Sequence, residues 1–521
     1  MIDATHLDQL NAQQLRQTVR SLIGTMASQA SQIERKDREI AFKQAVIDKI
    51  PHEMAVLKRL KFAAKSEAFN AEQKSLLDET IDADMEALQR ELDALQQPVK
   101  DEGDKQKPKR QALPEGLPRR EIHHEPQSTT CKCGCQLKRI DQDVAEKLDY
   151  VPGVFTVEQH IRGKWVCTNC ETLIQAPVPA HVIDKGIPTA GLLAQVLVAK
   201  YADHLPLYRQ ESIFARAGLA LARSTLAQWV GQCGVQLQPL VDALRAELLK
   251  HSVLHADETP VAMLKPGNGK THRAYLWSYC TTTYNETKAV VFDFADSRAG
   301  QHARDFLGLP GQDGWHGSLV CDDFSGYKAC FEMGVTEAGC LAHARRKFHE
   351  VWANHQSTIG ERALRFFIQL YDVEREVREL DVAHRKRVRQ ERSRPVADAM
   401  HLWLGEQRKK VPEGSATIKA IDYSLGRWQA LTRYLGDGEL PADNNWVENQ
   451  IRPIAIGRNN WLFAGSLRAG KRAAAVMSLV HSARLNGHDP YAYLKDVLER
   501  LPTQPASRVD ELLPHRWSPA G

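Results

Sequence analysis

Two short apolar runs that each end in an aspartate constrain the fold of this chain more than any other feature. Asp257 closes the run at residues 253–257, and Asp322 closes the run at residues 319–322. Apolar runs of this length predict buried strands. Strand-end aspartates are common turn formers, so either residue alone would say little. Together, two strand-end carboxylates predict part of a site for divalent cations.

The elements around these aspartates follow a recognisable order. The predicted strands cover residues 253–257, 273–279, 288–294, 319–322 and 336–341, and the predicted helices cover residues 297–307 and 342–352. Three strands, a helix, and two more strands leading into a helix are typical of the ribonuclease-H-like fold. That fold carries one carboxylate on its first strand and one on its fourth, where Asp257 and Asp322 fall. We therefore expect a multidomain α/β protein with a ribonuclease-H-like catalytic core.

Glu448 is the third acidic residue of interest. The segment 443–445, Asp-Asn-Asn, offers N-cap chemistry, so a helix should begin there with Glu448 in its first turn or just beyond. An acid at this place can simply favour the positive end of the helix dipole. The basic and aromatic residues that follow instead favour a third metal ligand. Three carboxylates could hold two Mg²⁺ or Mn²⁺ ions, which activate a water or hydroxyl in phosphodiester chemistry and so point to DNA cutting and joining.

Neighbouring acids compete with these assignments. Adjacent side chains in a strand point to opposite faces, so only one of two neighbours can meet the metal. We choose Asp257 over its neighbour Glu258. We choose Asp322 over Asp323, which stays in reserve. Asp293, at the end of the third strand, is expected to be a carboxylate at a hairpin edge rather than a ligand.

Basic and aromatic residues near the acids predict contact with DNA. Basic groups bind phosphates, and aromatic rings can stack on unpaired bases. The predicted DNA-binding residues are Arg345, Arg346, Lys347, Arg452, Arg458, Trp461, Arg468, Lys471 and Arg472. His343 could orient water or bind phosphate, or it could be an ordinary residue at a helix start.

Five of the ten cysteines cluster in a module that we assign to residues 121–175. They are Cys131, Cys133, Cys135, Cys167 and Cys170. Two knuckles on a small β unit predict one structural Zn²⁺ bound by four of these five thiols. The first knuckle offers three cysteines for two places, so Cys133 and Cys135 compete. Alternating apolar and polar residues predict two short strands within residues 150–165.

The rest of the chain is predicted to be helical or a linker. Residues 1–96 should form long helices interrupted at Pro51, either a coiled coil for dimerisation or DNA binding, or an antiparallel hairpin. Residues 97–120 form a basic linker. Residues 180–250, with a break at Gly218 and Ser224 as a cap, predict a helix-turn-helix or a plain packing unit. A helical insertion at residues 355–435 separates core residues 251–354 from core residues 436–468, and residues 469–521 form a C-terminal helical segment and tail.

Bulk properties exclude some classes of protein. A chain of 521 residues is too long for one core. Its net charge of +4 is too weak to demonstrate nucleic-acid binding alone. No run approaches the length of a membrane span, and the N-terminus lacks a signal-peptide pattern. We therefore expect a cytoplasmic protein with no membrane association, whose cysteines stay reduced or bind metal.

Several motifs make the chain resemble the transposases of the insertion-sequence-sixty-six family of bacterial mobile elements. They are residues 255–260 (HADETP), 340–348 (CLAHARRKF) and 443–448 (DNNWVE), followed by 452–453 (RP), 457–458 (GR) and 461–466 (WLFAGS). The resemblance covers nearly the whole chain, including an N-terminal helical region, a zinc-binding segment and a small C-terminal segment.

The resemblance implies a DDE transposase with Asp257, Asp322 and Glu448 as its catalytic triad. Such an enzyme binds the terminal inverted repeats of its insertion sequence, cleaves DNA and joins the end to target DNA. Work on two ends implies a homo-oligomer, at least a dimer, and relatives often travel with small accessory proteins. The chain departs from the family at Asp323, where Gly is common, and at Asn449, where Arg is common. It also departs at the first cysteine knuckle, which is often a simple C-x-x-C.

Two other functions fit the same residues. A structure-specific nuclease or resolvase on the ribonuclease-H-like fold would cut DNA without joining it. A non-enzymatic, zinc-containing DNA-binding protein would bind through the zinc module and the helical region, and its acids would be structural. Strand-transfer products would distinguish a transposase from the first alternative, and metal-independent binding without cleavage would favour the second.

Overall fold

The computed structural model describes residues 12–63, 71–95, 113, 115, 117–126, 128–131, 133–151, 153–183, 186–265, 270–311 and 314–519. The chain divides into two compact units. One comprises Met1–Ser66 and Leu88–Gln106, and the other comprises Glu67–Ala87 and Lys107–Gly521. The second unit contains both the cysteine module and the predicted catalytic core.

The first unit contains helix α1 (Ala12–Ala63) and the C-terminal part of helix α2 (Ala71–Leu95). The predicted interruption at Pro51 is wrong, because α1 runs through this residue. A proline removes one backbone hydrogen bond, which a helix of this length tolerates. Ile33 and Ile40 of the predicted apolar stripe are exposed, as residues that pair with a second helix would be. The dimer contact stays a prediction.

The cysteine module is built on a four-stranded sheet. Its strands are β1 (Arg119–His124), β2 (Leu137–Val151), β3 (Val154–Cys167) and β4 (Leu173–Gln175). β2 and β3 pair along their whole length, and Gly153 turns the chain between them at a φ of +96°. The hairpin is thus much longer than the two short strands predicted, because charged residues in β2 obscure its alternating pattern. One end carries Cys167, and the other buries Leu148 and Phe155 in the main core.

Five strands form the central sheet. They are β5 (Val253–Met263), β6 (His272–Thr281), β7 (Val290–Ala295), β8 (Ser318–Cys321) and β9 (Thr336–Gly339). Their order is β7-β6-β5-β8-β9, with β5, β6 and β7 antiparallel and with β8 parallel to both β5 and β9. This arrangement confirms the ribonuclease-H-like core. One boundary is wrong: β5 continues past Asp257 to Met263, because residues 257–260 pair with residues 275–278 of β6.

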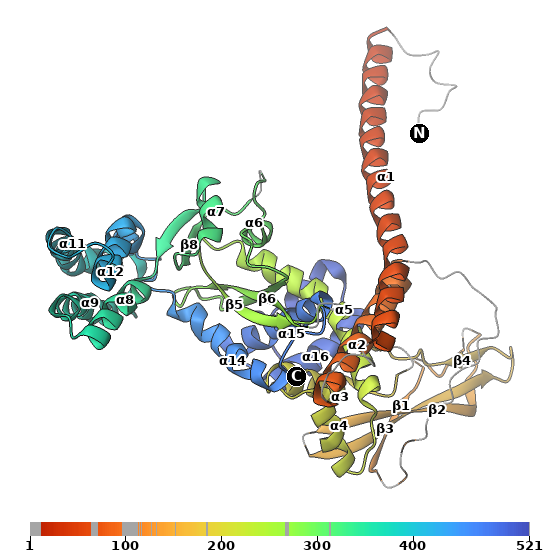
Figure 1. Ribbon diagram of the computed structural model, residues 1–521. Coiled ribbons are helices and arrows are strands. Elements are labelled where there is room, and N and C mark those ends of the chain that lie inside the picture. Colours follow the sequence, from red (N-terminus) through yellow and green to blue (C-terminus); the bar gives the residue numbers. More distant parts are fainter. Residues whose placement is uncertain are drawn as a thin grey trace. The chain divides into compact units, whose positions relative to one another are not determined.

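Helices on the sheet complete one large hydrophobic core (Figure 1). They are α3 (Ala190–Tyr201), α4 (Leu207–Arg216), α5 (Arg223–Leu248), α14 (Asn445–Trp461), α15 (Leu467–Leu485) and α16 (Pro490–Arg500). Two shorter helices, α6 (Gln301–Leu307) and α7 (Lys328–Glu332), lie in the segment between β7 and β9. The predicted helix at residues 297–307 is therefore confirmed in its second half.

Helix α15 protects the edge strand β7. The Ser478 hydroxyl accepts a hydrogen bond from the backbone N–H of Phe292 at 2.8 Å. The Ser482 hydroxyl accepts from the N–H of Val290 and donates to its carbonyl, each at 3.0 Å. Ser478 and Ser482 are four residues apart and so lie on one face of α15. Val290 and Phe292 are two residues apart and so direct their backbone groups to the same edge of β7. One helix face can therefore bond to one strand edge. These bonds satisfy an edge that would otherwise be open to pairing with another chain.

Helices α4 and α5 occupy the region of the predicted helix-turn-helix. Gly218 lies between them with a φ of +87°, as a break should. Ser224 does not cap α5, because the N-cap residue is Ala222. Instead the N–H of Arg223 donates to the Glu211 carboxylate of α4 at 3.0 Å. A role of this pair in reading DNA stays a prediction.

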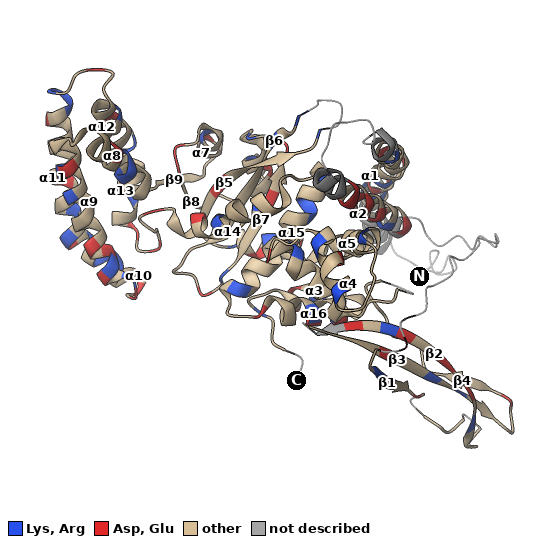
Figure 2. Cartoon of the chain, turned by 60° about the horizontal axis from the view of Figure 1, so that its bottom comes forward, with Lys and Arg blue, Asp and Glu red and all other residues tan. Residues whose placement is uncertain are grey.

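The predicted insertion forms a second hydrophobic core, which also includes α8 (Leu341–His355) and the sheet residues Val253, Val320 and Ala338. Its members are α9 (Thr358–Val377), α10 (Val382–Val388), a π-helical turn (Arg389–Ser393), α11 (Arg394–Arg408), α12 (Ala416–Gly426) and α13 (Trp428–Thr432). Figure 2 shows that acidic and basic residues alternate along these helices. The fully buried Arg389 pairs with Glu374 at 2.6 Å and donates to the carbonyl of Leu440 at 2.9 Å. This contact ties the insertion to the segment that leads into α14.

The part of α2 that belongs to the second unit carries two buried acids. The Glu79 carboxylate pairs with Lys200 and accepts from the N–H of Leu207 at 3.1 Å. Asp84 pairs with Arg472 at 3.0 Å. Buried acids of this kind need partners, because an unpaired charge in a core is costly. Lys200 comes from α3, which packs on α16 and β2, and Arg472 comes from α15, which packs on β7 of the central sheet.

Candidate active site and metal centre

Asp257 and Asp322 come from neighbouring strands of the central sheet. The parallel ladder between β5 and β8 ends where His255 pairs with Val320. Asp257 lies in β5 two residues after His255, and Asp322 directly follows the last residue of β8, Cys321. Burial raises the pKa of Asp257 well above its usual range, and the carboxylates of Glu258, Asp322 and Glu448 raise it further. A bound cation would relieve this repulsion.

The neighbouring acids have other partners. Glu258 points to the opposite face, where its carboxylate accepts from Arg298 at 2.8 Å and from the Tyr327 hydroxyl at 2.8 Å. Asp323 pairs with Arg427 at 3.3 Å. These contacts occupy both competing carboxylates, and the choice of Asp257 and Asp322 as ligands stays a prediction. Trp277 of β6 pairs with Glu258 on one side and with Asp293 on the other. Paired residues point to the same face of a sheet, so Asp293 lies on the face of Glu258 and not on that of Asp257.

Glu448 lies in the first turn of α14, as predicted. Asn444 is the N-cap residue, but its side chain does not cap the helix. Instead, its amide donates to the carbonyl of Ala256 at 2.8 Å, and its oxygen lies 2.8 Å from Nδ1 of His255. Burial lowers the pKa of His255 to about 4, so the ring is neutral and donates from Nδ1. These bonds join the helix that carries Glu448 to the strand that carries Asp257.

Two basic side chains of α8 approach Glu448. Nδ1 of His343 lies 3.8 Å from one carboxylate oxygen, and the guanidinium of Arg346 lies 3.7 Å from the other. Among the described residues, Glu448 also forms a group with His343 and Cys340 in which ligand atoms lie within 4.8 Å of one another. The carboxylate oxygens of Asp257, Asp322 and Glu448 do not all lie within 4.8 Å of one another. Their oxygens suit Mg²⁺ or Mn²⁺, and a pair of ions about 3.5–4 Å apart needs a wider arrangement than one ion does.

The cysteine module brings four thiols together. Cys131, Cys133, Cys167 and Cys170 form one group within 4.8 Å, and Cys135 stays outside it. The sulfur of Cys131 lies 3.2 Å from that of Cys170. The sulfur of Cys133 lies 3.6 Å from that of Cys167 and 3.7 Å from that of Cys170. Four sulfurs each about 2.3 Å from one zinc ion would be roughly 3.8 Å apart. The Thr172 hydroxyl and backbone N–H lower the pKa of Cys170 to about 6, which favours a thiolate ligand. The thiols therefore fit a closed structural zinc site.

Four of the nine predicted DNA-binding residues are exposed. They are Arg345, Arg346, Arg452 and Lys471. Arg345 and Arg346 line a surface pocket together with Asn445 at the start of α14. Lys347 lies 4.5 Å from the centre of the Tyr423 ring, and this cation–π contact holds it against the insertion.

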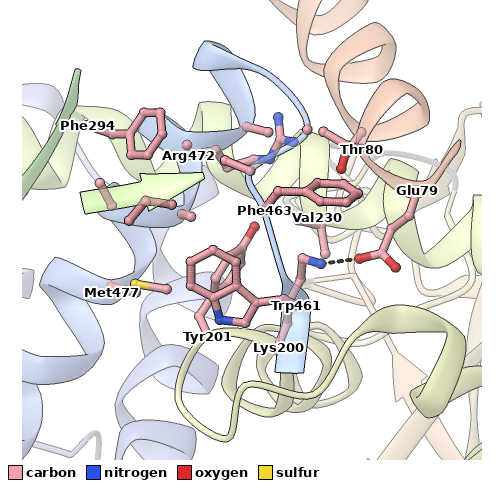
Figure 3. A pocket seen from close by; sticks show the side chains of 18 of the residues that line it. Glu79, Thr80, Lys200, Tyr201, Val230, Phe294, Trp461, Phe463, Arg472 and Met477 are labelled. Atoms are coloured by element: carbon pink, nitrogen blue, oxygen red, sulfur yellow. Dashed lines mark hydrogen bonds and ion pairs between the residues drawn. The ribbon is translucent and has the colours of Figure 1, made fainter. Parts of the chain in front are cut away.

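Other predicted DNA-binding residues turn inward. Figure 3 shows Trp461 and Arg472 lining a pocket beneath α2. Only 8% of Arg472 is exposed, so its guanidinium faces Asp84 rather than solvent, and we do not retain it as a DNA contact. Arg458 donates to the carbonyl of Pro260 and so braces β5. Arg468 is half-buried. Sequence reasoning also missed two residues, Asn444 and Arg298, whose partners lie far away along the chain.

No helix in the described part of the chain is long and apolar enough to cross a membrane. Comparison with family models gives four matches. They are the Transposase IS66 family at residues 185–472, the IS66 C-terminal element at 478–515, the zinc-finger binding domain of transposase IS66 at 128–171, and the Transposase C of IS166 homeodomain at 51–122.

Relatives from Sinorhizobium fredii match most of the chain. The uncharacterized protein y4qI is 37% identical over 489 residues, which cover 89% of this chain and 88% of the relative. The uncharacterized protein y4jD is 35% identical over 78% of this chain and 81% of its own length. The uncharacterized protein y4hP is 34% identical over 80% of this chain and 78% of its own length. With the first family model spanning more than half of the chain, the protein belongs to the IS66 family of DDE transposases.

Proposed function

We propose that this protein mobilises an insertion sequence by binding its terminal inverted repeats, cleaving DNA there and joining the freed 3′ hydroxyl to target DNA. The observation that carries the proposal is the arrangement of three carboxylates. Asp257 lies in β5, Asp322 directly follows the neighbouring strand β8, and both Asp322 and Glu448 lie close enough to raise the pKa of Asp257. Family membership supports the same reaction.

Each carboxylate comes from a different element, and their roles differ accordingly. Asp257 and Asp322 supply oxygens from adjacent strands, and Glu448 adds a third from α14. Two Mg²⁺ or Mn²⁺ ions bound there would activate the attacking hydroxyl and stabilise the leaving oxygen. The bonds of Asn444 to His255 and Ala256 fix the position of α14 relative to β5. The enzyme thus presents one site that serves both cleavage and joining.

Basic residues around this site would hold the DNA backbone. We assign phosphate contacts to Arg345, Arg346, Arg452 and Lys471, which are exposed, and to Arg468, which is half-buried. Lys347, Arg458 and Trp461 have partners within the protein, and we assign them no direct phosphate contact. One Zn²⁺ on Cys131, Cys133, Cys167 and Cys170 would rigidify the β module. The long N-terminal helices would join at least two copies, since two element ends must react together, and small accessory proteins of the element are further partners.

The test uses the DNA that flanks the gene of this protein. Purified protein with Mg²⁺ or Mn²⁺ is added to a labelled plasmid that carries those flanks, with a second plasmid as target. We expect nicks at the ends and joined products, both lost in Glu448→Gln. Glu350→Gln, an exposed glutamate on α8, is the matched control and should behave as wild type.

Other outcomes would point elsewhere. Cutting without joining would support a nuclease or resolvase. Binding without any reaction under either ion would contradict the proposal for the protein acting alone.

A further inference from the structure

His343 and Glu448 face each other with one unsatisfied atom each. Nδ1 of His343 lies 3.8 Å from Oε1 of Glu448. Both atoms are inaccessible to solvent, and neither has a hydrogen-bond partner among the residues that the structure describes. Buried polar atoms in native proteins rarely lack partners, and an ion is one of the explanations when they do. A separation of 3.8 Å is too long for a hydrogen bond.

One cation between these two atoms would satisfy both. Ligand atoms about 2.1 Å from the same ion lie roughly 3–4.2 Å apart, depending on the angle between them. The observed 3.8 Å falls in this range. His343 lies in the first turn of α8, which begins at Leu341, two residues after the end of β9, so the sheet fixes its place.

The third member of this cluster, Cys340, has a different role. Its thiol is fully buried and accepts a hydrogen bond from the backbone N–H of Asn444 at 3.1 Å. A soft sulfur ligand is also a poor match for Mg²⁺ or Mn²⁺, which prefer carboxylate oxygens. The cluster therefore offers a cation one imidazole nitrogen and one carboxylate.

We propose that His343 is a further protein ligand of one of the two catalytic cations and binds it through Nδ1 beside Glu448. This inference rests on the proposed function, because it needs the ions that Asp257, Asp322 and Glu448 would hold. An imidazole in an otherwise all-oxygen site shifts its preference from Mg²⁺ toward transition metals. His343→Gln should therefore weaken binding of Mn²⁺ by at least about tenfold and weaken binding of Mg²⁺ less.

The experiment reads the ligand directly and does not depend on activity. Full-length, zinc-loaded protein with ¹⁵N-labelled histidine is given one equivalent of Mn²⁺ and studied by pulsed electron paramagnetic resonance. We expect a hyperfine coupling from histidine ¹⁵N that disappears in His343→Gln. His349→Gln changes an exposed histidine on the same helix, and it should keep the coupling. The labelled wild type gives an answer even if His343→Gln folds poorly.

Two results would overturn the inference alone. Bound Mn²⁺ without histidine coupling in the wild type would make His343 at most a hydrogen-bonding neighbour of Glu448. A coupling that persists in His343→Gln would identify another histidine, such as the buried His255. Failure of the proposed function looks different, because then Mn²⁺ would bind equally well to Asp257→Asn and Glu448→Gln.

Discussion

Nδ1 of His255 lies 2.8 Å from the side-chain oxygen of Asn444, and this buried hydrogen bond joins β5 to the start of α14. The two residues are 189 positions apart in the sequence. One is two residues before Asp257, and the other is four residues before Glu448. The separation of the two carboxylates that we propose as catalytic therefore depends on a pair of side chains that need not touch substrate.

Asn444→Ala should lower both stability and activity. The change leaves His255 Nδ1 and the Ala256 carbonyl buried without partners, at about 1–3 kcal/mol for each group. We expect a lower melting temperature and at least a tenfold slower cleavage rate, because α14 loses its fixed position. Asn445→Ala, at the exposed neighbour, should stay within about 0.5 kcal/mol of wild type. Equal effects of the two changes would contradict this role.

Substitution of the two aspartates after β8 should affect the cleavage rate to very different extents. Asp322→Asn removes a ligand from cations that contribute several kcal/mol to the transition state, so cleavage should fall by at least about 100-fold. Binding of labelled element ends should stay nearly unchanged. Asp323→Asn breaks only the ion pair with Arg427 and should keep most of the cleavage rate. If Asp323→Asn abolished cleavage and Asp322→Asn did not, the ligand assignment would be reversed.

Asp257→Asn should stabilise the metal-free protein. Burial and nearby carboxylates raise the pKa of Asp257 above its ordinary value of 3.8. A raised pKa of an acid means that its charge opposes folding, so the penalty is absent below pH 3.8 and grows as the pH rises through the folded pKa. We expect the melting temperature of the variant to exceed that of wild type by about 2–4 °C at pH 8 and by less at pH 5.

The same melting temperatures should also be measured with Mg²⁺ present. Mg²⁺ should raise the melting temperature of the wild type, because binding to the folded state raises apparent stability. It should have little effect on Asp257→Asn, which lacks a proposed ligand. Asp398→Asn, an exposed aspartate on α11, is the control and should show neither effect. If Asp257→Asn had the same melting temperature as wild type at both pH values, Asp257 would carry no buried charge.

The zinc module allows a direct choice between two cysteines. Cys133 belongs to the group of four thiols, and Cys135 does not. Cys133→Ser should therefore reduce zinc affinity by more than about 100-fold, since even the loss of an outer-shell partner costs 10–100-fold. Cys135→Ser should keep one zinc per chain. Metal analysis after dialysis against a chelator measures both, and retained zinc in Cys133→Ser with loss in Cys135→Ser would reverse the assignment.

Much of the catalytic core could be predicted from the sequence because its signals are local. The apolar runs before Asp257 and Asp322 predicted strands, and the order of elements predicted the sheet. The choice between Asp257 and Glu258 followed from the alternation of side chains along a strand. Glu448 was found because capping residues precede it within a few positions.

The rest depends on contacts between distant residues. The segment 443–445 looks like a helix cap, but Asn444 bonds instead with β5. Arg472 follows a run of basic and aromatic residues that is typical of a DNA-binding surface, yet Asp84 of α2 pairs with it in the core. Neither partner can be recognised from the sequence around the residue itself. A choice between Cys133 and Cys135 likewise needs the turn of the knuckle in three dimensions.

The buried acids of α2 bear on how relatives of this protein can diverge. Glu79 and Asp84 neutralise Lys200 and Arg472, so a core made without α2 would keep a buried arginine without its counter-charge. Breaking a buried ion pair in this way costs about 3–5 kcal/mol. Recombination that exchanges N-terminal regions between relatives would have to preserve both acids in register. The N-terminal region is thus bound to evolve together with the core and cannot be traded as an interchangeable module.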